Sequence, residues 1–585
     1  MHAPLLSSAS IVALAAIASS QQLLETFTGS VGDQFGARLH VTADQNSDGY
    51  LDLVIGMPGH NSGRGMVRCL SGRFIATGQG SSVLWDVIPG FLPGAAFGSS
   101  IVEVASLTGN NATDFLIGAP GFVGPGGMAT TGALILVDGA TRAIVSIVHG
   151  ESGTRLGEEL VPLFDQDGDG TIDVAATAPA ASGPSKVRIV WGSSLTTSGP
   201  VASAPGTSLM LNGSNAFGRA LASGFDLDGD GRYELAIGSP DMFSGGLLSV
   251  YRADGSWTPV ASYLGSVAGE RMGASVDCGP DFDGDGSPDL VVGAPNWSAG
   301  VATQDGRAVV LSGLRLRNAL PQPELFTLTL PVGIAPGNFH FGAAARTGVD
   351  LTLDGVAEIL VGAPDFFTAS PFGPGKGAAA VFSGATGLRL VGVSGANHDR
   401  LGDELLAGPF DLDGDGFAEF AVAGSLSDNA TVDCGALKFY SLFPAPVASY
   451  CTGKVNSLGC TPSVGWSGTP SATAGAPFLV NCAQLINQTA GLAIYSGRPN
   501  AAPFQGGELC VKPPLRRSPV LAAGGSSSGA DCSGAFTYDL GARIQAGVDP
   551  LLAPGAELFL QFWARDPQAA STTSLSNALR LLVAP

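Results

Sequence analysis

The sequence predicts an all-β fold, in which a seven-bladed β-propeller is followed by a small β-sandwich-like C-terminal domain. Three observations lead to this prediction. A short pattern recurs seven times with a period of about 60 residues. Each repeat contains four short apolar runs that are typical of strands. The chain is rich in turn-forming residues, with 85 glycines and 38 prolines among 585 residues.

Each repeat opens with a bulky residue followed by glycine. An acidic loop follows this glycine at a nearly constant distance, and Gly-Xaa-Pro or a related triplet follows the loop. Because all copies keep this order, we interpret them as one repeated structural unit. The seven opening steps are Phe35-Gly36, Phe97-Gly98, Leu156-Gly157, Phe217-Gly218, Met272-Gly273, Phe341-Gly342 and Leu401-Gly402.

The apolar runs predict four strands in each repeat. The run that follows each acidic loop, such as Leu51–Ile55, is apolar at consecutive positions, so both of its faces should be buried. Sheets that stack around an axis bury both faces of each blade, and this favours a propeller. In the third repeat the four runs are Leu156–Leu163, Val174–Ala178, Lys186–Trp191 and Ser208–Leu211.

The first strand of the chain is expected to close the ring. Leu23–Thr28 lies before Phe35 as Leu388–Val393 lies before the step of the seventh repeat. The seventh repeat has no such run of its own after Ala436–Ser441. We therefore expect Leu23–Thr28 to complete the seventh blade, whereas an open solenoid would need a cap at each end.

The acidic loops follow the template Asp-x-Asp-x-Asp-Gly-x-x-Asp/Glu. Ca²⁺ takes about six to eight oxygen ligands, which positions 1, 3, 5 and 9 and a backbone carbonyl can supply around a tight glycine turn. Carboxylates this close repel one another unless a cation is present. One such loop could be only an acidic hairpin turn, since Asp-Gly is a common turn pair. Several loops in one register favour about five Ca²⁺ sites, with a weaker sixth.

The predicted ligands come from six loops. The first loop replaces one carboxylate by an amide, and the sixth has fewer carboxylates. The second loop, Ser106, Thr108, Asn110 and Asp114, has lost most of its charge and is expected to bind nothing. The ligands are Asp44, Asn46, Asp48, Asp52; Asp165, Asp167, Asp169, Asp173; Asp226, Asp228, Asp230, Glu234; Asp281, Asp283, Asp285, Asp289; Asp350, Asp354, Glu358; and Asp411, Asp413, Asp415, Glu419.

Charge and hydropathy restrict the class of protein. A net charge of −21 disfavours nucleic-acid binding, which needs a basic surface. Residues 1–20 are predicted to be a secretory signal peptide, with the apolar core Ile11–Ala18 before the small residues Ser19 and Ser20. This core is too short to span a bilayer and no other segment qualifies, so we expect a secreted or surface protein without a transmembrane segment.

Cysteines are concentrated near the C-terminus, at positions 451, 460, 482, 510 and 532. Together with the signal segment, they predict disulfides formed in an oxidising compartment. Their number is odd, so at least one thiol is free or pairs elsewhere. Runs such as Leu492–Tyr495 and Leu558–Trp563 predict that residues 446–585 form a small β-sandwich, after a propeller over 21–445.

The repeat resembles the FG-GAP repeat of integrin α-subunit propellers. The resemblance covers roughly 22–445 and rests on the Phe-Gly step, the acidic loop and Gly-Ala-Pro at 118–120, 293–295 and 362–364. The third repeat departs from it with Thr177-Ala178-Pro179, and the seventh with Ala423-Gly424. It implies calcium binding and cell adhesion, with ions in more blades than is typical of integrins. No inserted metal-dependent adhesion domain is visible.

Residues 446–585 resemble a module of secreted bacterial proteins, which implies a bacterial origin and indicates no activity. In this module we expect the disulfides Cys451–Cys460 and Cys510–Cys532. The segments that carry the resemblance are Tyr450-Cys451-Thr452, Asn456-Ser457-Leu458-Gly459-Cys460-Thr461-Pro462, Leu509-Cys510-Val511 and Asp531-Cys532-Ser533-Gly534.

The integrin resemblance implies an extracellular binding or adhesion module for a protein or glycan partner, bound on the face opposite the acidic loops. The segments 121–131, 296–305 and 365–376 would supply that face. Packing between blades is the alternative for most of their aromatic residues, which are Phe122, Trp297, Phe366, Phe367 and Phe372.

No catalytic constellation is visible in the sequence. Gly525–Gly529 matches the Gly-x-Ser-x-Gly nucleophile pattern but lacks the strand–turn–helix context that this pattern needs. We therefore expect no enzyme. Two alternatives remain open: a Ca²⁺-dependent polysaccharide lyase or hydrolase on a propeller scaffold, and a structural component of the cell envelope.

Overall fold

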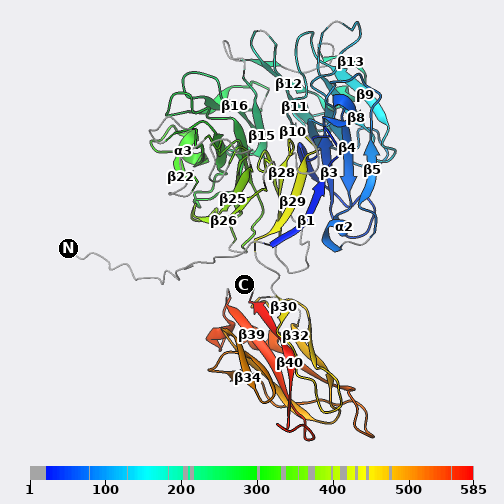
Figure 1. Cartoon of the computed structure of the whole chain (residues 1–585). Coiled ribbons are helices and arrows are strands. Elements are labelled where there is room, and N and C mark those ends of the chain that lie inside the picture. Colours follow the sequence, from blue (N-terminus) through cyan, green and yellow to red (C-terminus); the bar gives the residue numbers. More distant parts are fainter. Residues whose placement is uncertain are drawn as a thin grey trace, which may run out of the picture. The chain divides into compact units, whose positions relative to one another are not determined.

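The computed structural model divides the chain into two compact units, with the division after Leu442 (Figure 1). No helix among the described residues is long and apolar enough to cross a membrane. The expected signal peptide lies outside the described residues. These are 22–77, 80–127, 129–181, 183–201, 208–210, 216–253, 255–298, 304–330, 338–352, 355–366, 376–396, 399–408, 418–427, 433–442, 447–473, 477–554 and 556–583.

Within this part of the chain, the first unit contains seven antiparallel sheets, each built on four strands. In spatial order they are β2 (Arg38–Thr42), β3 (Asp52–Met57), β4 (Met66–Leu70), β5 (Val83–Val87); β6 (Ser100–Val104), β7 (Asp114–Gly118), β8 (Ala133–Val137), β9 (Ile144–His149); β10 (Leu160–Leu163), β11 (Asp173–Ala178), β12 (Lys186–Val190), β14 (Ser208–Met210); β15 (Ala220–Phe225), β16 (Glu234–Ser239), β17 (Leu247–Arg252), β18 (Pro259–Leu264); β19 (Ser275–Cys278), β20 (Leu290–Ala294), β21 (Arg307–Leu311), β22 (Glu324–Leu328); β23 (Ala344–Thr347), β24 (Ile359–Ala363), β25 (Ala378–Phe382), β26 (Arg389–Ser394); and β27 (Glu404–Ala407), β28 (Phe420–Gly424), β29 (Ala436–Ser441), β1 (Gln22–Thr28).

Short elements decorate these sheets. The strand β13 (Gly199–Pro200) pairs in parallel with β9 at the edge of the second sheet. The others are short helices in the connections between strands: α1 (His60–Gly63), α2 (Gly72–Thr77), α3 (Gly313–Arg317) and the 3-10 helix η1 (Gly192–Thr196).

The seven sheets close into a ring. The first strand of each sheet contacts the first strand of the next, and β27 contacts β2. The strand β1 pairs antiparallel with β29, with Thr28 opposite Ala436 and Gln22 opposite Ser441. Figure 1 shows β1 beside β29, so strands from both ends of this unit share one sheet. The all-β propeller is therefore confirmed, and its N-terminal strand completes the last sheet as predicted.

The bulky-residue–glycine steps lie where each blade meets the preceding one. Phe341 is fully buried and forms a parallel bridge with Gly306 of the preceding blade. A Cβ atom added to Gly293 would lie 2.0 Å from the carbonyl oxygen of Gly342. The bulky side chain therefore fills the space between blades, while the paired glycines let two backbones touch. This close approach explains why both glycine motifs recur together.

The strands after the acidic loops are buried along their whole length, as their apolar sequences predicted; β3 and β20 are examples. The first strand of the third blade differs from the expected run Leu156–Leu163, because it begins only at Leu160. Gly157 has a φ of +91°, and this turn separates Leu156 from the strand.

The second unit is a two-sheet sandwich, as predicted. Side chains from both sheets form one core, in which the Phe536 and Phe562 rings lie 5.9 Å apart. One sheet contains β30 (Val447–Tyr450), β40 (Thr573–Leu582), β39 (Glu557–Arg565), β33 (Ala490–Ser496), β36 (Arg516–Arg517) and β37 (Leu521–Ala522); the other contains β31 (Ser463–Ser467), β32 (Leu479–Leu485) and β38 (Gly534–Asp539). The remaining elements are the hairpin β34 (Pro499–Phe504)–β35 (Gly507–Val511), α4 (Leu540–Gln545) and the 3-10 helix η3 (Pro550–Leu552).

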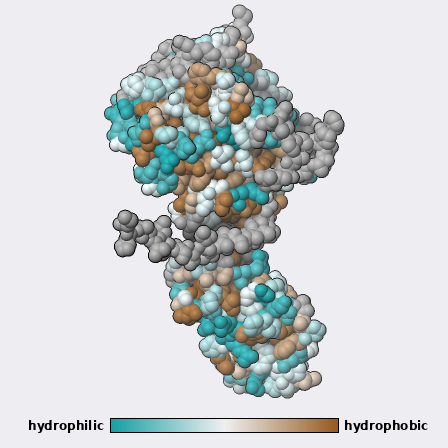
Figure 2. Space-filling view, turned by 90° about the vertical axis from the view of Figure 1, so that its left-hand side faces the viewer, coloured by the Kyte–Doolittle hydropathy of each residue, from teal (hydrophilic) through white to brown (hydrophobic). Residues whose placement is uncertain are grey.

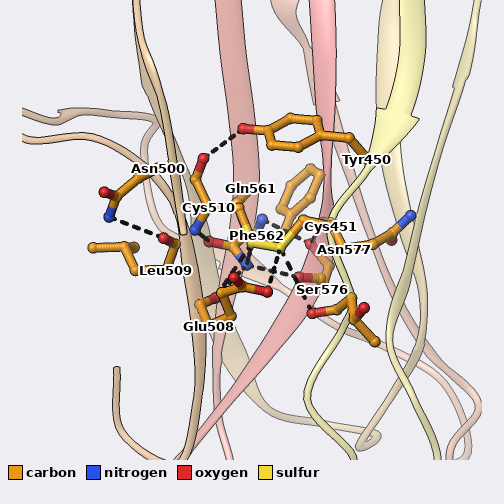
Figure 3. Close-up of a disulfide and its surroundings, with 11 residues drawn as sticks. Tyr450, Cys451, Asn500, Glu508, Leu509, Cys510, Gln561, Phe562, Ser576 and Asn577 are labelled. Atoms are coloured by element: carbon orange, nitrogen blue, oxygen red, sulfur yellow. Dashed lines mark hydrogen bonds between the residues drawn. A yellow bond between two sulfur atoms is a disulfide. The ribbon is translucent and has the colours of Figure 1, made fainter. Parts of the chain in front are cut away.

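The expected disulfide pairing, Cys451–Cys460 and Cys510–Cys532, is wrong. The disulfides are Cys451–Cys510 and Cys460–Cys532, with Cα–Cα distances of 6.3 and 6.5 Å. Cys451 follows β30 and lies beside β35, where the Tyr450 hydroxyl donates to the Cys510 carbonyl at 2.5 Å (Figure 3). A turn closed by the Asn456 N–H and the Cys460 carbonyl (2.8 Å) separates Cys460 from Cys451. The fifth thiol, Cys482, is free and buried.

A buried glutamine attaches the β34–β35 hairpin to the sandwich. Gln561 of β39 is fully buried, and its side chain lies beside the Cys451–Cys510 disulfide (Figure 3). Its amide group donates to the carbonyls of Glu508 (3.0 Å) and Ser576 (2.8 Å), and its oxygen accepts from the Cys510 N–H (3.1 Å). Because these bonds satisfy the polar atoms of the amide, the hairpin is held by a disulfide and by a hydrogen-bonded core residue.

Candidate metal centres

The acidic loops connect the first and second strands of the blades. In the fourth blade, the Asp226 carboxylate accepts hydrogen bonds from the N–H groups of Gly229 (2.7 Å) and Gly231 (2.8 Å). Both glycines have positive φ angles. This tight turn brings one oxygen from each acidic side chain within 4.8 Å of the others; the four residues are Asp226, Asp228, Asp230 and Glu234.

The third and fifth loops form comparable clusters. In each loop, three aspartates each place one carboxylate oxygen within 4.8 Å of the others. The remaining predicted ligand of the third loop, Asp169, accepts a hydrogen bond from the Thr171 hydroxyl at 2.5 Å. The converging residues are Asp165, Asp167 and Asp173 in the third loop and Asp281, Asp283 and Asp285 in the fifth.

The other predicted sites are only partly placed. In the first loop, the Asn46 amide donates to Asp48 at 2.9 Å, and Asp44 accepts from the Gly49 N–H at 2.7 Å. In the sixth loop, Asp350 accepts from the Gly355 N–H at 2.7 Å, and Glu358 is buried. The predicted ligands Asp354, Asp411, Asp413 and Asp415 lie outside the described residues, whereas Glu419 is described and buried.

The ninth loop position has a structural role that the sequence analysis missed. Asp289 is fully buried and accepts from the N–H groups of Gly313 (2.9 Å) and Phe282 (2.7 Å). It therefore ties the loop to the end of the third strand. The glycine that follows the third strand could have indicated this contact from the sequence. A Cβ atom on Gly313 would lie 2.0 Å from the Pro288 carbonyl oxygen, so only glycine lets the loop approach this closely.

Burial disfavours the charged form of these ninth-position carboxyl groups. It raises the pKa of Asp289 to about 7 and that of Asp173 to about 6, and nearby carboxylates act in the same direction. The pKa of Glu234 is raised to about 7 for the same reasons. A bound cation would favour the charged form of all three groups.

The fourth loop fits a divalent cation. The Oε1 atom of Glu234 is buried and has no hydrogen-bond partner among the described residues. Buried carboxylate oxygens rarely lack a partner, so this atom is available to a cation. The ligand atoms that converge here are all carboxylate oxygens, and hard divalent cations such as Ca²⁺ favour such a set.

The second loop uses its own side chains as donors. The Asn110 amide donates to Asp138 at 2.7 Å, and the Thr108 N–H donates to Asp114 at 2.9 Å. Asp114 also accepts from the Gly139 N–H at 2.8 Å. Neutral donors of the protein thus contact its carboxylates, and the expectation that this loop binds no ion stays a prediction.

The aromatic residues expected on a partner face pack against the blades, as the alternative predicted. Phe366 is buried, and its ring lies 5.2 Å from that of Phe339. Phe122 packs on the second blade, and Trp297 packs beneath the guanidinium of Arg307 at 5.4 Å. Phe367 and Phe372 lie outside the described residues. Hydrophobic and hydrophilic residues are intermixed on the face shown in Figure 2.

A charged network in a central cavity was not predicted. The cavity of about 500 Å³ lies along the first strands of the blades. Arg38 pairs with Glu159 at 2.5 Å and lies 3.8 Å from Glu404, which also pairs with Arg346 at 3.3 Å. Each of these carboxylates faces an arginine, so the network cross-links blades and neutralises its own charge. Arg38 and Glu404 are the first residues of β2 and β27, and Glu159 directly precedes β10.

The C-terminal match to a nucleophile pattern lies in an irregular connection. Residues 525–529 fall between β37 and β38, and the Ser526 hydroxyl donates to the Ser528 carbonyl at 3.1 Å. The strand–turn–helix geometry of a nucleophile elbow is therefore not formed by this segment.

Comparison with known proteins agrees with this architecture. Residues 226–292, which begin at the fourth acidic loop, match the family of the FG-GAP-like repeat. Integrin alpha-PS2 of Drosophila melanogaster is 27% identical over 238 residues, or 38% of this chain and 16% of that protein. Human integrin alpha-10 is 31% identical over 227 residues, or 36% of this chain and 18% of that protein.

A different kind of protein also matches. Bovine phosphatidylinositol-glycan-specific phospholipase D is 27% identical over 383 residues, or 59% of this chain and 45% of that protein. The chain thus spans less than half the length of each of these relatives. With its ring of sheets, Phe-Gly steps and acidic loops, the chain is identified as an FG-GAP repeat protein similar to integrin α subunits.

Proposed function

We propose that the chain is a calcium-binding propeller whose ions stabilise the ring. The observation that carries this proposal is the convergence of carboxylate oxygens in the third, fourth and fifth loops. Repulsion within each cluster disfavours the closed loop, and a divalent cation converts this repulsion into attraction. The template extends the proposal to the first, sixth and seventh loops, which gives about five ions and a weaker sixth.

We further propose that the protein is secreted and binds an extracellular protein or glycan. Two disulfides in the second unit support an oxidising compartment. The integrin relatives support adhesion or ligand binding as the use of the propeller. The proposed contact face is formed by the segments after Gly-Xaa-Pro, opposite the acidic loops, with polar groups rather than the packed aromatic rings.

Titration of the full chain with Ca²⁺ by calorimetry tests the proposal. We expect about five ions, and we expect Asp283→Asn to weaken one site by about tenfold or more, because it removes a converging charge. Glu25→Gln is the matched control, since Glu25 is exposed on β1 away from the loops and its loss should change no site. Absence of calcium binding, or equal titrations for Asp283→Asn and the parent chain, would contradict the assignment.

A further inference from the structure

In three blades, the residue at the end of the third strand or directly after it contacts the acidic loop. In the fifth blade this residue is Ser312, whose hydroxyl donates to Asp285 at 3.0 Å. Its counterpart in the first blade, Ser71, lies 3.5 Å from Asp48. At this position a small neutral donor contacts the fifth residue of its acidic loop and adds no charge to the cluster.

In the fourth blade the same position is an arginine. Arg252 lies directly opposite Glu234 in the β16–β17 pairing. Its Nε atom donates to Oδ2 of Asp228 at 2.7 Å, and its Nη2 atom donates to the same oxygen. Nε also lies 3.8 Å from Oδ2 of Asp230. The Asp228 side chain is only 7% exposed, whereas that of Arg252 is 35% exposed, so the aspartate is shielded from solvent and the arginine partly reaches it.

The fourth loop differs from the fifth in a second way. Gly313 follows Ser312 and donates its N–H to Asp289, whereas Ala253 follows Arg252. Glu234 is bonded to the Leu227 N–H at 2.5 Å through Oε2, but its buried Oε1 has no partner among the described residues. The loop therefore combines an unpaired ligand oxygen with an aspartate that is already paired to a cationic side chain.

We infer that Arg252 is a tethered counter-ion that competes with the divalent cation for Asp228, making the fourth loop weaker than the third and fifth. This inference rests on the proposed function. A guanidinium and a metal ion cannot both bind Oδ2 of Asp228 at close range, because like charges repel. Cation binding through this oxygen therefore requires Arg252 to leave, and an ion bound through Oδ1 would share Asp228 with the guanidinium and be held more weakly.

Terbium luminescence that is sensitised by Tyr233 reports on binding at this loop. Tb³⁺ serves as the calcium substitute, and Tyr233, which directly precedes Glu234, serves as its sensitiser. Tyr233→Phe keeps an aromatic ring to stack on Phe164, at a centroid distance of 4.0 Å, but removes the sensitiser. Because Phe164 directly precedes Asp165, the signal lost on this change comes from the third and fourth loops. Of the described residues in these two loops, only those of the fourth contact Arg252, so a difference between the titration curves of the parent chain and an Arg252 variant belongs to the fourth loop.

Arg252→Ser introduces the residue found in the first and fifth blades. We expect it to tighten Tb³⁺ binding at the fourth loop by about tenfold or more. Arg232→Ser is the matched control, because Arg232 is an exposed arginine of the same loop; we expect a change within about threefold. Arg252→Lys keeps the charge and should remain close to the parent chain.

Equal affinities for the parent chain and Arg252→Ser would overturn the inference, provided that calorimetry still finds ions in the third and fifth loops. Absence of ions from all loops would instead overturn the proposed function, and the inference with it. Thermal melting of Arg252→Ser without cation shows whether the variant is folded. If it is not, Arg252→Gln, which keeps the length of the side chain, gives the same comparison with the same expected and contradicting results.

Discussion

Replacing Gly362 by alanine is expected to prevent closure of the ring, or to cost more than about 4 kcal/mol of unfolding free energy. A Cβ atom at this position would lie 2.0 Å from the carbonyl oxygen of Gly402 and 2.8 Å from its carbonyl carbon. Both atoms belong to the backbone of the next blade, which cannot move without separating the two sheets. Denaturant unfolding of the purified variant measures the loss.

The control for this substitution is Gly90→Ala. A Cβ atom on Gly90 would meet nothing within 4 Å. We expect a change in unfolding free energy within about 0.5 kcal/mol, as for most surface substitutions. If Gly362→Ala unfolds at the same denaturant concentration as Gly90→Ala, backbone contact between blades is not what the glycine motifs provide.

Removal of β1 is expected to open the ring and lower the melting temperature of the first unit by more than about 10 °C. The loss leaves β29 as an unpaired edge and uncovers Phe439, whose ring lies 6.1 Å from that of Phe27 in β1. Exposed edges of this kind promote association between chains. Calorimetry and light scattering of a chain that begins at Gly29 measure both effects.

A chain that begins at Gln22 and keeps β1 is the control for this deletion. A synthetic peptide of residues 22–28 should restore part of the lost stability, because an extended peptide can add to a free sheet edge. An unchanged melting temperature after removal of β1 would show that the first unit is stable as an open array, which contradicts closure by this strand.

The repeated part of the fold could be predicted from the sequence because the same sequence pattern recurs in each blade. The expected run Val174–Ala178 matches β11, and Leu23–Thr28 matches β1, because strand positions follow local turns and apolar runs. The acidic template likewise predicted the convergence of Asp226, Asp228 and Asp230, since residues on one tight turn are neighbours in any fold.

Contacts between distant segments could not be predicted in this way. Arg252 reaches Asp228 only because β16 and β17 pair with Glu234 opposite Arg252, and the sequence does not state this register. Arg38 and Glu159 meet across the centre of a ring of sheets. The predicted disulfide pairing was wrong for the same reason, because four cysteines allow three pairings and long-range strand order decides among them.

Melting of the full chain in calcium and in chelator tests the central claim most directly. The second unit forms its own core and carries none of the acidic loops, so its transition serves as an internal reference. We expect chelator to lower the melting temperature of the propeller by more than about 10 °C and to leave that of the sandwich unchanged. Identical melting of the propeller in calcium and in chelator would contradict the claim that bound cations hold the acidic loops and stabilise the ring.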